Sequence, residues 1–180
     1  IKGTSPRSDE KSADLKYREE LLNEKNKAEN LMIVDLVRHD LSLIAETGSV
    51  EVSKLFDVQS FGTVHQLIST IEATALNNVH PVDVIKACFP MGSMTGAPKI
   101  EVMKTIERLE IYRRGIYSGA IGYFTPEGDF DFNVVIRSAI INGGNVIYPV
   151  GGAITGDSIP EAEGEETHVK ARVFTRIAEK

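Results

Sequence analysis

Acidic side chains at the start of the last predicted helix could bind a divalent cation. Glu161, Glu163, Glu165 and Glu166 crowd its first turns, with Lys170 following. Glu163, Glu166 and Lys170 are spaced by three and four residues, which places them on one side of a helix. Magnesium takes carboxylate oxygens as ligands. The alternative is a solvated helix start, because acidic residues near an N-terminus favour the helix dipole.

Three further residues are single candidates for chemistry. Glu29 follows a predicted helix N-cap at Asn26, so its alternative role is in a capping box. His65 shares one face of a predicted strand with Leu67, and a satisfied core histidine is the alternative to a catalytic one. Arg137 stands inside an apolar strand, where an arginine lies at a sheet edge or pairs with an anion.

A glycine-rich loop at residues 92–99 leads into a helix predicted to begin at Pro98. Glycines let backbone amides approach a ligand closely, and a helix N-terminus favours an anion. Lys99 would add positive charge. The spacing differs from that of a phosphate-binding P-loop, so the loop is either an anion site or a plain turn.

Helices and strands must position these residues. Apolar periodicity predicts helices at residues 12–22, 26–47, 81–89, 98–110 and 160–178. Alternation and turn signals predict strands at residues 50–55, 63–75, 118–124, 130–141 and 146–154. The strands are linked largely by hairpins and the helices come in separate groups, so we expect an α+β fold with antiparallel sheet.

The composition is that of an ordinary globular chain and excludes several classes of protein. The 180 residues carry a net charge of -6, which argues against a nucleic-acid binder because phosphate contacts need a clustered basic surface. No apolar run is long enough to span a membrane. The first residues are polar, so we expect no signal peptide there. The single cysteine, Cys88, fits a reducing cytoplasm.

Several stretches, in order, resemble those of the chorismate-binding family, which includes anthranilate, aminodeoxychorismate, isochorismate and salicylate synthases. They are residues 1–7, 27–38, 92–99, 113–115, 119–123, 136–138, 151–154, 160–163, 165–167 and 170–171. The resemblance implies a sandwich of antiparallel sheets with helices outside and the active site between the sheets. It also implies that residues 1–180 are the C-terminal portion of one catalytic domain. The N-terminal part, with the family's general-acid glutamate, would lie upstream.

The same resemblance implies roles for individual residues. Glu29 and Glu166 would be the Mg²⁺ ligands, and the metal would bind the ring carboxylate of chorismate. His65 would act beside the reacting ring, and Thr95 would line the pocket. The residues expected to hold the substrate carboxylates are Tyr123, Arg137, Gly151, Gly152 and Lys170.

Lys2 indicates which reaction to expect. The corresponding position typically carries alanine in anthranilate synthases and lysine in the members that aminate chorismate at C4. Lys2 could be a nucleophile that adds to the ring and is displaced by ammonia, or it could only balance substrate charge. We expect Mg²⁺-dependent formation of 4-amino-4-deoxychorismate, for para-aminobenzoate and folate synthesis. The alternatives are anthranilate or isochorismate synthesis, and a non-catalytic module that binds an aromatic anion.

The expected nitrogen source is ammonia from a separate glutamine amidotransferase subunit. Nothing in the sequence resembles a glutaminase, because Cys88 precedes Phe89-Pro90 and lacks a Gly-x-Cys-x-Gly setting.

Overall fold

The computed structural model describes residues 1–178, and the chain divides into two units, Ile1–Ile111 and Tyr112–Lys180. Each unit combines helices with antiparallel strands. The α+β prediction is therefore confirmed. Within the described residues, no helix has the length and apolar character that crossing a membrane requires.

The first unit is built on a three-stranded antiparallel sheet with the order β1-β3-β2. Its strands are β1 (Thr4–Pro6), β2 (Glu51–Ser60) and β3 (Val64–Glu72). The predicted alternation along β3 is confirmed, since His65 and Leu67 share a face and are 1% and 0% exposed. Leu67 packs with Leu21 and Val58 in the core of this unit.

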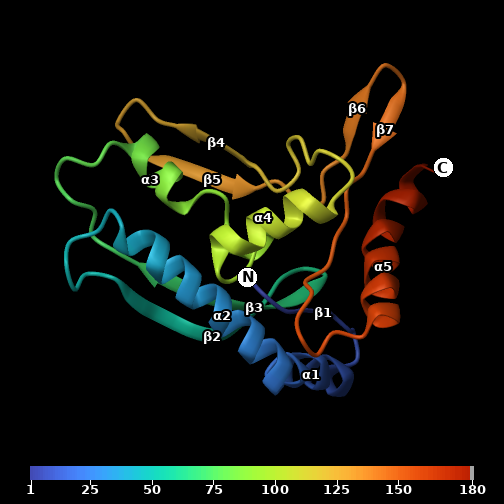
Figure 1. Ribbon diagram of the computed structural model, residues 1–180. Helices are drawn as coiled ribbons and strands as arrows, with labels where there is room; N and C mark the ends of the chain where they lie inside the picture. Colours follow the sequence, from blue (N-terminus) through green and yellow to red (C-terminus); the bar gives the residue numbers. More distant parts are fainter. Residues whose placement is uncertain (179–180) are drawn as a thin grey trace. The chain divides into compact units, whose positions relative to one another are not determined.

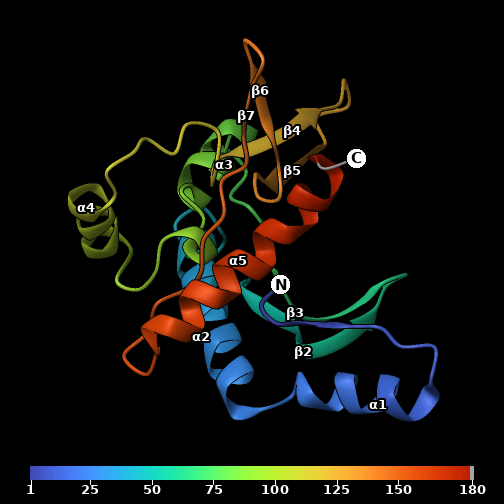
Figure 2. The same ribbon diagram turned by 90° about the vertical axis from the view of Figure 1, so that its right-hand side faces the viewer.

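Helices α1 (Lys11–Glu20) and α2 (Glu24–Ser42) contact this sheet. Figures 1 and 2 both show α2 beside β3, and Figure 2 shows α1 as a separate helix that precedes it. The predicted N-cap at Asn26 is wrong. Asn23 caps the helix instead, and its side chain accepts a hydrogen bond from the Asn26 backbone N–H. Glu29 is therefore beyond the first turn and cannot complete the predicted capping box.

The rest of the first unit consists of α3 (Pro81–Cys88), a short 3₁₀ helix η1 (Gly92–Met94) and α4 (Lys99–Leu109). Both α3 and η1 contact α2. Pro98, predicted as the first helical residue, is the N-cap of α4, so the helix begins one residue later, at Lys99. The glycine-rich loop therefore runs from η1 to α4 along α2.

The second unit contains two hairpins and the last helix. Strands β4 (Ala120–Phe124) and β5 (Phe130–Val134) form the first hairpin, and β6 (Ile140–Asn142) and β7 (Asn145–Ile147) form the second. Helix α5 spans Pro160–Ala178, as predicted. β7 is shorter than the predicted strand at residues 146–154, and Pro149, which has no N–H for a ladder, follows it.

The strand predicted at residues 130–141 is wrong, because the chain turns between β5 and β6. The Ile136 N–H donates to the Val134 carbonyl, a three-residue turn that ends the pairing with β4. Arg137 follows with a φ of 54°, in the left-handed region that strands do not use. Arg137 thus lies in a bend between strands, not inside one.

Candidate functional site

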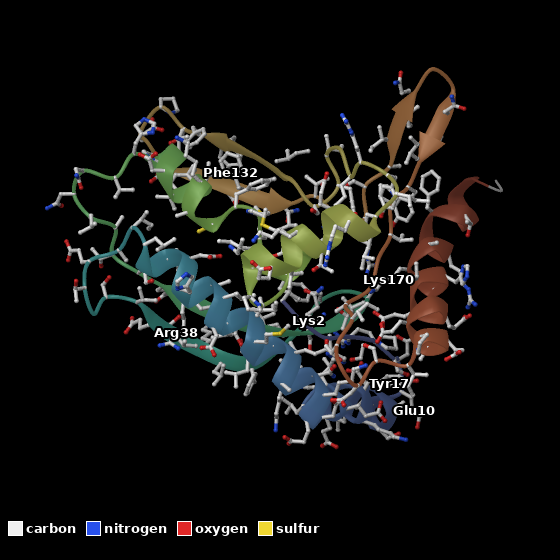
Figure 3. The ribbon with its side chains drawn as sticks, in the orientation of Figure 1. Lys2, Glu10, Tyr17, Arg38, Phe132 and Lys170 are labelled. Atoms are coloured by element: carbon white, nitrogen blue, oxygen red, sulfur yellow. The ribbon has the colours of Figure 1, made fainter. Side chains whose placement is uncertain are left out.

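Lys2 is fixed at the edge of the first unit's sheet and reaches α2 (Figure 3). Its backbone N–H donates to the Leu67 carbonyl over 3.0 Å, and the Leu67 N–H donates to the Gly3 carbonyl. The Lys2 ammonium nitrogen, Nζ, lies 3.2 Å from Glu29 Oε2. The structure therefore brings together a predicted catalytic residue and a predicted metal ligand.

Glu29 is held between two lysines. Its other carboxylate oxygen lies 3.9 Å from Nζ of Lys25, one turn earlier on α2, and 18% of its side chain is exposed. This carboxylate is therefore partly accessible. It offers oxygen ligands to a cation that can compete with the lysines.

Asn30 is a positioning residue that the sequence did not single out. It is 2% exposed, and its amide donates to the carbonyls of Lys2 (3.4 Å) and Leu67 (3.3 Å). Its carbonyl accepts from Ser69 Oγ over 2.6 Å. Asparagine is a poor helix former, so an asparagine in the interior of a predicted helix is the signal that marks it. Asn30 ties α2 to the strands next to Glu29.

His65 is enclosed in a polar network. One ring nitrogen lies 2.8 Å from Ser60 Oγ and the other 2.9 Å from Asp14 Oδ1. Asp14 also accepts from the Ser8 N–H and from Arg7 Nε. The Ser8 hydrogen bond, followed by those of Arg7 and His65, lowers the pKa of Asp14 to about 2. This geometry is that of a satisfied core histidine, and the catalytic role of His65 stays a prediction.

The glycine-rich loop carries Thr95, which hydrogen-bonds within the loop. Thr95 Oγ1 donates to the carbonyls of Met91 (3.2 Å) and Gly92 (3.4 Å). The Lys99 side chain pairs with a carboxylate of α2, and its Nζ lies 2.6 Å from Asp40 Oδ2. The positive charge of Lys99, predicted to serve an anion site, is therefore paired with Asp40. This pairing favours the alternative, in which the loop is a turn into a helix.

In the second unit, Lys170 on α5 (Figure 3) contacts two other predicted site residues. Lys170 Nζ lies 2.6 Å from Glu166 Oε1, one helical turn away, as their spacing predicts. The same ammonium donates to the Gly151 carbonyl over 3.0 Å. Lys170 therefore links the predicted metal ligand to the predicted carboxylate-binding glycines.

Glu163 lies close to Gly152. It is 9% exposed, and its carboxylate accepts from Ser158 Oγ over 2.9 Å. A Cβ added at Gly152 would lie 3.3 Å from Glu163 Oε2, so glycine lets the backbone approach the carboxylate. A pocket of about 320 Å³ adjoins them, lined by Gly152, Ile154, Ser158, Pro160, Glu163, Gly164 and Thr167.

Tyr123 and Arg137 are displayed to solvent in the second unit. Tyr123 lies on β4 opposite Asp131 and is 61% exposed. Arg137 is exposed in the bend after β5. The binding of a substrate carboxylate by Tyr123 and Arg137 stays a prediction.

The carboxylates fit magnesium in chemical type. In residues 1–178, no group of three or more His, Cys, Asp or Glu side chains lies close enough to hold a metal ion. Magnesium, however, keeps several waters and is commonly held by only one or two carboxylates together with the substrate. Glu29 and Glu166 each offer such a carboxylate, paired with a lysine.

Comparison with known proteins adds independent information. The sequence profile described as chorismate binding enzyme matches residues 1–176. The chain is 51% identical to an aminodeoxychorismate synthase of Streptomyces griseus, over 98% of this chain and 25% of that protein. It is 44% identical to aminodeoxychorismate synthase component 1 of Salmonella typhimurium, over 94% of this chain and 38% of that protein.

A solved structure shows the same fold. The crystal structure of anthranilate synthase component I from Streptococcus pneumoniae TIGR4 has a TM-score of 0.82 and 36% identity, covering 95% of this chain and 41% of that chain. The present chain thus spans less than half the length of each of these three relatives.

Proposed function

This chain belongs to the chorismate-binding enzyme family, and on that premise we propose that the full-length protein converts chorismate and ammonia into 4-amino-4-deoxychorismate. The observation that carries the proposal is Lys2, with its ammonium 3.2 Å from Glu29. A lysine at this position is typical of the members that aminate chorismate at C4. The 51% identity to the Streptomyces griseus enzyme, against 36% to the anthranilate synthase component, supports the same reaction.

Lys2 is proposed as the ring nucleophile. Its neutral amine forms a carbon–nitrogen bond to the ring while the 4-hydroxyl, protonated by the family's general-acid glutamate, leaves as water. Ammonia then forms a bond at C4, and the Lys2 amine leaves with the electrons of its own bond to the ring. The ion pair with Glu29 holds the amine in place before attack. The amine must lose a proton and leave this ion pair to react.

Glu29 and Glu166 are the proposed Mg²⁺ ligands. When bound, Mg²⁺ would hold and polarise the ring carboxylate of chorismate. Lys170, 2.6 Å from Glu166, would add positive charge for that carboxylate. Tyr123, Arg137 and the glycines at positions 151 and 152 would bind the enolpyruvyl carboxylate.

The remaining proposed pocket residues are Thr95, on the glycine-rich loop, and His65. His65 would act beside the reacting ring, and its hydrogen bonds with Ser60 and Asp14 would orient its imidazole.

Ammonia is proposed to come from a separate glutamine amidotransferase subunit. Burial, with the nearby Asp40 carboxylate, raises the pKa of the Cys88 thiol, which keeps it protonated and poorly nucleophilic. Cys88 is therefore unsuited to hydrolyse glutamine. A cytoplasmic location is proposed with this scheme, because the sequence contains no second cysteine for a disulfide.

Anthranilate synthesis is the second candidate, favoured by the similarity to the Streptococcus pneumoniae component at a TM-score of 0.82. Purified full-length protein, incubated with chorismate, Mg²⁺ and an ammonium salt, distinguishes the candidates by product. We expect 4-amino-4-deoxychorismate, and we expect glutamine to replace the ammonium salt only when the partner subunit is added. Anthranilate or isochorismate as the main product would refute the proposal. Chorismate binding without turnover would indicate a non-catalytic module.

A further inference from the structure

Lys99 and Asp40 carry charges that their own helices disfavour. Lys99 is the first residue of α4, and Asp40 lies in the last turn of α2. A cation at a helix N-terminus and an anion near a C-terminus both oppose the helix dipole. Their side chains nevertheless meet at 2.6 Å, with 17% and 6% of their surfaces exposed. The ion pair between α2 and α4, rather than a preference of either helix, explains why both charges are present.

The same face of α2 carries Glu29. Leu36 and Asp40 follow Glu29 by seven and eleven residues, which returns each to nearly the same angular position on an α-helix. At roughly 1.5 Å per residue, Asp40 lies about 16 Å along the helix axis from Glu29. A helix keeps this separation constant, so α2 fixes the distance between Glu29 and Asp40 and the groups that they contact.

The glycine-rich loop is attached to that face at two points. A Cβ added at Gly92 would lie 2.9 Å from Leu36 Cδ1, so the loop backbone lies directly on the helix. One turn further along α2, Asp40 holds Lys99 at the other end of the loop. Thr95 lies between these two attachments and bonds to the loop's own carbonyls.

We propose that Asp40 and Lys99 are positioning residues that hold the loop carrying Thr95 in a fixed relation to Glu29 along α2. The inference rests on the proposed function, in which Thr95 and Glu29 serve the chorismate site. It differs from direct binding of an anion by Lys99, because the charge of Lys99 acts on Asp40 and not on the substrate.

Single substitutions in the full-length enzyme test the pair first. Asp40→Asn and Lys99→Met should each lower kcat/KM for chorismate by on the order of 10²-fold, the loss that a displacement of about 1 Å causes. Asp35→Asn is the matched control on the same helix. It removes the ion pair between Asp35 and Arg38, whose side chains are 67% exposed for Asp35 and 51% exposed for Arg38. The substitution should leave turnover unchanged. Wild-type turnover in both pair variants would overturn the inference.

A double substitution separates positioning from direct binding. Replacing a buried ion pair by apolar residues of similar volume is often neutral, whereas removing one partner leaves an uncompensated charge. Asp40→Leu combined with Lys99→Met should therefore recover most of the activity that either single variant loses. If the double variant remained as impaired as Lys99→Met alone, the Lys99 charge would contact the substrate and the inference would be wrong.

Amide hydrogen exchange in residues 91–97 gives a readout that does not depend on turnover. Exchange there should accelerate in both single variants, return toward wild type in the double variant, and stay unchanged in Asp35→Asn. Unchanged exchange in both singles would overturn the inference even if activity fell. If the full-length protein did not aminate chorismate, the proposed function would fail, and this exchange pattern would still decide whether the pair holds the loop.

Discussion

Lys2 Nζ lies 3.2 Å from Glu29 Oε2, so the proposed ring nucleophile and a proposed metal ligand are in direct contact. Both are anchored by neighbouring hydrogen bonds, Lys2 through the Leu67 carbonyl and Glu29 through the adjacent Asn30 on α2. A carboxylate oxygen that coordinates a cation is less available to a lysine. The two proposed roles are therefore coupled, and variants of one residue will affect the other.

Glu29→Gln and Glu166→Gln should each cripple Mg²⁺-dependent turnover while the fold stays intact. A glutamine keeps the shape of the side chain but loses the charge that a hard cation prefers. The loss should exceed the roughly 10–100-fold typical of residues that only support a ligand. Steady-state rates across a Mg²⁺ titration measure it.

Matched controls lie on the same two helices. Glu24→Gln on α2 and Glu165→Gln on α5 remove exposed carboxylates that pair with Lys27 and Arg172. Both should retain wild-type rates. Wild-type activity of Glu29→Gln or Glu166→Gln at limiting Mg²⁺ would show that the substituted residue is not a ligand.

Lys2 variants separate nucleophilic from electrostatic roles. Lys2→Arg keeps a cation within reach of Glu29 but provides no neutral amine, so we expect it to lose amination activity. Mass spectrometry of full-length enzyme quenched with chorismate and Mg²⁺, without ammonia, should detect an adduct on Lys2. Lys2→Ala should remove that adduct and leave ammonia to attack the ring directly. An active Lys2→Arg variant together with repeated absence of any adduct would leave Lys2 an electrostatic role only.

Arg137→Ala should raise KM for chorismate by roughly tenfold or more, because a charge-assisted hydrogen bond to a carboxylate is lost. Arg172→Ala is the control, since Arg172 is an exposed arginine of the same unit that pairs with Glu165. Initial rates over a range of chorismate concentrations give both constants. If KM and kcat of Arg137→Ala both matched wild type, Arg137 would have no part in substrate binding.

Asp14 should make the free energy of unfolding depend on pH in the acidic range. Its pKa is lowered from 3.8 to about 2 in the folded chain, so its ionised form favours folding above pH about 4. That contribution should disappear progressively as the pH falls from about 4 toward about 2. Urea unfolding midpoints of wild type and Asp14→Asn should differ at neutral pH and converge in acid. Asp9→Asn, at an exposed neighbouring position, should show no such convergence, and a pH-independent difference for Asp14→Asn would contradict the shift.

Local patterns correctly predicted the last helix and the shared helix face of Glu166 and Lys170. α5 spans Pro160–Ala178, and Glu166 meets Lys170 at 2.6 Å, because a spacing of four residues alone places two side chains together on a helix. The N-cap of α2 was misplaced for a local reason as well. Asn23 and Asn26 are equally good caps, and periodicity does not choose between two candidates three residues apart.

The errors in strand extent had a different cause. Residues 134–140 read as a continuous apolar strand, yet the Ile136–Val134 turn ends the pairing and leaves Arg137 in a left-handed conformation. An apolar run indicates that residues are buried, but it does not indicate the residue at which pairing with the partner strand ends. The same limit applies to His65. Its face on β3 was predicted, but only packing supplied Ser60 and Asp14 to engage both ring nitrogens.

The sequence by itself determined the chorismate-binding family, the α+β class and the contacts between residues one helical turn apart, because these depend on residue identity and local periodicity. The tertiary structure alone decided that Lys2 meets Glu29, that Asn30 ties α2 to β3, and that Asp40 holds Lys99. These partners come from different elements. Their distances depend on how the helices pack on the sheet, and the periodicity of the sequence does not determine that packing.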